Sequence, residues 1–124
     1  MTRRRLEVLQ WLGLLLGAGA WAGGHAAGYA ITHAECGPRG APWGLGNATW
    51  EVSLMGVTAV FVVAAEVAAI TVVRGTRGTT YDADPPLARI RFFAIAAIVA
   101  NALFLVIVLL AGTASLTDAV CRQA

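Results

Sequence analysis

Charged side chains are scarce in this chain, and lysine is missing altogether. Asp, Glu, Lys and Arg together make up 13% of the 124 residues, and all nine basic residues are arginines. A soluble globular domain carries about 25% charged residues. Since 58% of the residues here are hydrophobic, the polar ones are too few to cover a water-facing surface. This composition predicts an integral membrane protein of one domain.

The sequence also lacks the motifs of the common enzyme and cofactor classes. It has no glycine-rich nucleotide loop, no zinc motif and no Cys-x-x-Cys-His sequence for covalent haem. Ser53 and Ser115 have no partner base of the kind that a nucleophile triad needs. Inverted repeats, which mark many transporter folds, and basic patches with interleaved aromatics are missing as well. We therefore expect no catalysis, no metal site, no cofactor of its own and no nucleic-acid partner.

What the sequence does contain is long apolar runs. There are three: Leu6–Thr32, Trp50–Val73 and Ile90–Gly112. A helix that crosses a bilayer needs about 20 mostly apolar residues. The runs are continuous, whereas a membrane barrel needs many alternating segments of about 10 residues. We predict an all-α membrane protein, a single transmembrane domain over residues 1–124 with helices at about 6–32, 50–73 and 85–113.

The arginines predict the orientation of these helices. Seven flank the first helix start and the second loop: Arg3, Arg4, Arg5, Arg74, Arg77, Arg89 and Arg91. Only Arg39 and Arg122 lie in the first loop and the tail. Because positively charged loops stay inside, we expect a cytoplasmic N-terminus and a periplasmic or extracellular C-terminus. The alanine- and arginine-rich composition looks bacterial, which indicates the inner (cytoplasmic) membrane.

The N-terminal run has a second interpretation, as a cleavable signal peptide. A basic start precedes the run, and Ala20-Trp21-Ala22 matches a small-residue cleavage pattern. The chain stays apolar well past Ala22, so we favour a retained membrane helix.

The two cysteines, Cys36 and Cys121, follow the first and third helices. The arginine topology puts both on the outer side, which is oxidising in bacteria, so a disulfide is chemically allowed. Such a bridge would tie two helix ends together and contribute roughly 3–5 kcal/mol by closing a long loop. We favour this bridge over two unrelated free thiols. No second ligand cluster accompanies the pair, which argues against metal binding.

Three polar residues interrupt the predicted membrane helices: His25, Glu66 and Asn101. At 1.5 Å per residue, His25 lies about 9 Å above the midplane and Glu66 about 6 Å below it, so the two cannot pair. Glu66 and Asn101 differ in height by only about 6 Å, which allows a hydrogen bond. We favour a protonated Glu66 satisfied by Asn101 or by a neighbouring subunit over a proton path.

His25 shares a helix face with Trp21 and Tyr29, since the three are spaced four apart. It could bind haem iron, but no second axial ligand is suitably placed. The same helix carries two pairs of glycines at small-xxx-small spacing, Gly13 with Gly17 and Gly24 with Gly28. Such pairs let helices approach closely, so we expect these glycines to pack against another helix, within the chain or in a larger complex.

Short motifs in the first and last helices carry a family resemblance. The segment Ala20–Tyr29 reads AWAGGHAAGY, and the last helix contains RFFA from Arg91 and NALF from Asn101. With these motifs the chain resembles small three-helix bacterial membrane proteins encoded beside haem–copper cytochrome c oxidase genes. The matching positions are Trp21, His25, Tyr29, Cys36, Phe92 and Cys121. The resemblance implies an accessory subunit or assembly helper of an aerobic terminal oxidase or a related respiratory complex.

Three hypotheses for function follow. We favour a non-catalytic accessory subunit or assembly helper of a cytochrome c oxidase or an associated quinol-oxidising complex, surrounded by lipids and partner membrane subunits that carry any haem. The first alternative is a homo-oligomeric proton or ion conductor that uses Glu66. The second is a haem- or redox-handling membrane protein that uses His25.

Overall fold

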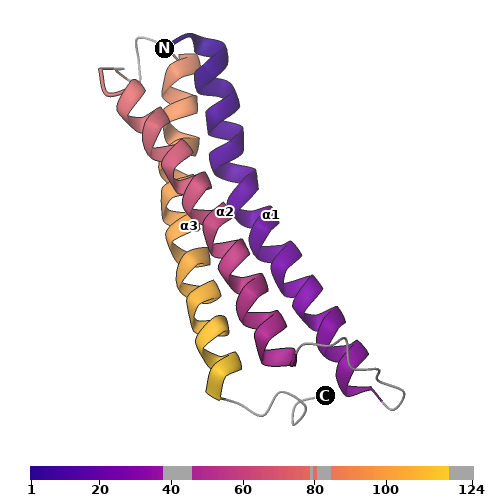
Figure 1. Cartoon of the computed structure of the whole chain (residues 1–124). Helices are drawn as coiled ribbons and strands as arrows, with labels where there is room; N and C mark the ends of the chain where they lie inside the picture. The colour runs from indigo at the N-terminus through magenta and orange to yellow at the C-terminus, as the bar shows by residue number, and fades with distance from the viewer. Residues whose placement is uncertain (38–45, 79, 81–84, 118–124) are drawn as a thin grey trace.

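The computed structural model describes residues 1–37, 46–78, 80 and 85–117, and these form three helices. They are α1 (Arg3–Cys36), α2 (Asn47–Gly75) and α3 (Pro85–Thr117). The described residues contain no strand. The helices lie side by side in an elongated up-down-up bundle (Figure 1), and each contacts the other two. The predicted all-α architecture with three helices long and apolar enough to cross a membrane is confirmed.

The helix ends follow from local backbone chemistry. Thr2 is extended, and its carbonyl accepts the first helical bond of α1 from the Leu6 N–H at 3.2 Å. The last turn of α2 closes on Thr76, whose hydroxyl and backbone N–H both bond to the Val72 carbonyl at 2.9 and 3.0 Å. α3 starts at Pro85, where a proline loses no helical hydrogen bond.

A small apolar core holds together the end of the bundle where α1 begins. Its buried members are Leu6, Val72, Ile90 and Ala94, one or two from each helix, and Leu9, Val73 and Leu87 pack around them. Arg91 from α3 reaches across the same end and donates to the carbonyls of Thr76 and Arg77 at 3.3 and 3.4 Å. These contacts fix the start of α3 against the end of α2.

Small side chains fill the interior of the bundle, and large ones cover its outer surface. Ala65, Ala69, Ala94 and Ala97 are fully buried between helices, whereas bulky side chains such as Leu110 point outward. A water-soluble bundle has the opposite arrangement, because it must bury its large apolar groups. Membrane helices pack through small residues and present large ones to lipid. The distribution of side chains therefore agrees with three membrane-spanning helices.

Candidate functional site

Asn101 links two helices in the middle of the bundle. Only 1% of this α3 residue is exposed. Its Nδ2 donates to the Gly13 carbonyl of α1 at 3.0 Å. A Cβ atom on Gly17 would overlap the Asn101 Oδ1, so the missing side chain of Gly17 makes the space that the amide occupies. This bond is the type of interhelical contact that polar side chains form in membranes.

The predicted packing glycines all face a neighbouring helix. A Cβ on Gly13 would lie 3.0 Å from the Ala69 Cβ and 3.1 Å from its backbone nitrogen, so α1 and α2 touch almost backbone to backbone there. A Cβ on Gly24 would overlap the Thr58 hydroxyl, while one on Gly28 would meet Leu54 and Met55 at ordinary contact distance. These four glycines therefore pack against helices of the same chain.

Glu66 lies beside this junction. Its carboxyl interacts with the Asn101 side chain, so the structure brings together the two residues that the depth estimate placed within reach. Glu66 Oε2 and Asn101 Oδ1 are both buried without a hydrogen-bond partner.

His25 lies in a separate aromatic cluster near the other end of α1. Its ring lies 5.3 Å from that of Trp21, and Trp21 stacks on Phe104 of α3 at the same distance. His25 Nδ1 is 3.0 Å from the Trp21 carbonyl. A carbonyl can only accept, so Nδ1 carries a hydrogen in this contact.

Tyr29 continues the same face of α1 but makes a different contact. Its ring meets that of His33 edge-on, with centroids 4.6 Å apart, and 70% of the residue is exposed.

No group of three or more His, Cys, Asp or Glu residues capable of holding a metal occurs in the part of the chain that the structure describes.

The far end of α1 is tied to α2. The Thr32 hydroxyl donates to the Glu51 carboxylate at 2.8 Å. Cys36 is disulfide-bonded. Cys121 lies outside the described residues, so its pairing with Cys36 stays a prediction.

Sequence reasoning missed one surface, which we name the open face of α1. It points away from α2 and α3, and its exposed residues are Trp11, Leu12, Leu15, Gly19, Ala22, Gly23 and Ala26. Nothing lies within 4 Å of a Cβ on Gly19 or Gly23. Toward the start of α1 the face is hollowed by a shallow apolar groove of about 450 Å³, lined by Val8, Trp11, Leu12, Leu15 and Leu16.

The signal for this face was present in the sequence. Gly19 and Gly23 also stand at small-xxx-small spacing, interleaved with the two pairs that pack inside the bundle. Spacing defines a helix face but not which face turns inward. Only the packing of α1 shows that this third pair stays uncovered.

Comparisons with known proteins identify no relative. No protein-family profile matches the chain, and neither a curated protein nor a solved structure is significantly similar to it.

Proposed function

We propose that this protein is a non-catalytic accessory subunit or assembly helper of a respiratory membrane complex, namely a cytochrome c oxidase or an associated quinol-oxidising complex. The observation that carries the proposal is the open face of α1. The bundle is closed by Gly13, Gly17, Gly24 and Gly28, and Gly19 and Gly23 are left uncovered. The partner class is inferred from the sequence resemblance.

The shape of the open face suits a helix from another subunit. Small residues let two helix backbones approach closely, which increases van der Waals contact in a solvent that offers no hydrophobic driving force between helices. Gly19, Ala22, Gly23 and Ala26 form such a flat surface. The adjoining groove beside Trp11 and Leu15 would accept bulkier side chains from the same partner helix.

The proposal includes an orientation in the bacterial inner membrane. Seven of the nine arginines belong to the ends of the helices that meet where α1 begins, or to the segment next to them. We place this end in the cytoplasm, because positively charged segments resist translocation. The opposite end, with Thr32, Glu51 and Cys36, then faces the periplasm or the cell exterior.

The test is a pull-down of the tagged chain from native membranes in mild detergent, followed by mass spectrometry and a visible spectrum. Stoichiometric recovery of oxidase or quinol-dehydrogenase subunits, with their haem bands, is the expected result. Recovery of the chain alone and without colour would contradict the proposal, and would also remove the haem-handling alternative based on His25.

One observation favours a second candidate, proton conduction through Glu66. The carboxyl has a buried oxygen without a hydrogen-bond partner, and an intramembrane carboxyl is the usual carrier in a proton path. If this candidate holds, proteoliposomes of the purified chain will conduct protons, and Glu66→Gln will abolish the flux while the bundle stays folded. Absence of flux from the unmodified chain, or equal flux in the variant, would exclude it.

A further inference from the structure

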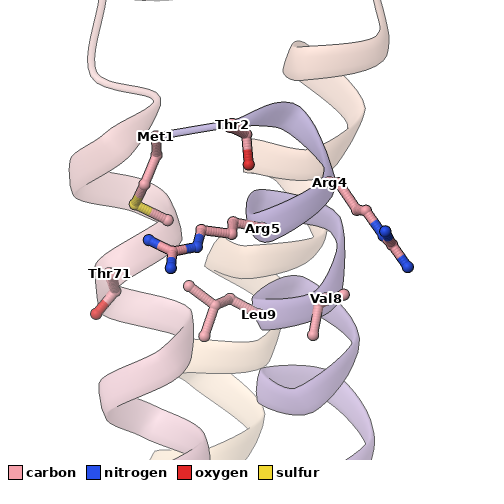
Figure 2. A pocket seen from close by; sticks show the side chains of 7 residues that line it. All are labelled: Met1, Thr2, Arg4, Arg5, Val8, Leu9 and Thr71. Carbon is pink, nitrogen blue, oxygen red and sulfur yellow. The ribbon is translucent and has the colours of Figure 1, made fainter.

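A basic cavity lies at the start of α1, between α1 and α2. Its volume is about 470 Å³. Its walls include Thr2 just before α1, Thr71 from α2, and Arg4, Arg5, Val8 and Leu9 from the first turns of α1. Figure 2 shows the Arg5 side chain extending from α1 across the gap toward α2, above Leu9, while Arg4 points out from the other side of α1. The cavity thus has a charged upper part and an apolar floor.

Among the residues that the structure describes, no acidic side chain pairs with the two arginines that line this cavity. Arg3 forms an ion pair with Glu7 at 2.9 Å. Arg4 and Arg5 form none with any residue that the structure describes, and no acidic residue lines the cavity. The first backbone N–H groups of α1 add positive potential at the same end, because no preceding helical turn supplies carbonyl groups to accept from them.

The depth and the shape of the cavity distinguish between a free phosphate and a phospholipid as its ligand. The cavity lies at the end of a helix long and apolar enough to cross a membrane, which is the level of lipid headgroups. Val8 is shared by this cavity and the apolar groove of the open face, so the apolar floor continues along α1 toward the middle of the membrane. A free phosphate would use only the charged part, whereas a phospholipid would use both.

We propose that this cavity binds one anionic phospholipid. The Arg5 guanidinium, which can make two parallel hydrogen bonds to a phosphate, holds the headgroup. An acyl chain lies along Val8 and Leu9. Basic pockets between membrane helices are known to select anionic lipids through this combination of charge and adjoining apolar surface. The inference goes beyond the proposed function and does not depend on the partner.

The test uses the purified full-length chain and counts bound lipids by native mass spectrometry, with phosphatidylglycerol and phosphatidylcholine in competition. We expect one phosphatidylglycerol to be retained preferentially. Arg5→Gln is expected to lower that preference about fivefold, the factor that the loss of one arginine contact near a membrane surface provides. Arg3→Gln is the matched control, since it removes the same charge from the arginine that is already paired with Glu7, and it should keep the preference.

A second variant protects the test against misfolding of Arg5→Gln. Thr71→Glu places a carboxylate on the α2 wall of the same cavity and should remove the preference while Arg5 stays in place. Equal losses in the Arg5 and Arg3 variants would show diffuse attraction and overturn the site, as would equal retention of the two lipids by the unmodified chain. Competition by inorganic phosphate alone would assign the cavity to free phosphate and overturn the lipid.

Discussion

Gly17→Ala is expected to destabilise the bundle by about 2 kcal/mol, within the usual range for overpacking a tight interior. The added Cβ would overlap the Asn101 Oδ1. The amide must then move, and the 3.0 Å bond from Asn101 Nδ2 to the Gly13 carbonyl is strained or lost. Unfolding of the purified protein in mixed micelles, titrated with a denaturing detergent, measures this loss.

Gly19→Ala is the matched control for Gly17→Ala. It makes the same chemical change two residues along α1, where nothing lies within 4 Å of the added atom. Alanine favours helix over glycine by up to about 1 kcal/mol, so this variant should be as stable as the parent or slightly more stable. If the two variants unfold alike, Gly17 does not make the space that Asn101 occupies.

Asn101→Ala is expected to lower stability by about 1–2 kcal/mol, since it removes an interhelical hydrogen bond and leaves a small cavity. A double-mutant cycle with Glu66→Ala isolates the contact between the two side chains. We expect a coupling energy of at least about 0.5 kcal/mol, as is usual for residues of one polar network.

A second double-mutant cycle, which pairs Glu66→Ala with Thr113→Ala, is the control. The Thr113 hydroxyl, also on α3, is exposed and bonds only within its own helix, to the Leu110 carbonyl at 2.9 Å. Thr113→Ala should be nearly neutral and additive with Glu66→Ala. Additive effects for Asn101 and Glu66 as well would mean that the two side chains act independently.

The bilayer explains why the three helices could be predicted from hydropathy. A membrane span must satisfy every backbone group within its own helix, so a long apolar run leaves little choice of structure. The helix ends were less predictable. α1 begins at Arg3 and ends at Cys36, beyond the predicted 6–32, because helical hydrogen bonds continue into the polar headgroup region where apolar content no longer marks them.

The sequence predicts the depth at which each polar side chain lies along the bundle, but not the direction in which it points. Rise per residue placed Asn101 near Glu66, and the structure puts these side chains in contact. The same estimate gave no reason to expect that Asn101 donates to Gly13, since that depends on how each helix is rotated about its axis. The rotation of α1 about its axis also decides which of its interleaved glycine pairs another helix covers. The open face of α1 could therefore be recognised only in the packed structure.

We propose that a helix of a respiratory partner covers the open face of α1. The most direct measurement compares pull-downs of the parent chain and of a Gly19→Leu, Gly23→Leu double variant from native membranes. Gly56→Leu on α2 is the control, because its Cβ also meets nothing within 4 Å. We expect the double variant to lose the oxidase or quinol-dehydrogenase subunits and their haem bands. The control should keep them, and the parent and both variants should unfold alike. Unchanged recovery of those subunits with the double variant would contradict it.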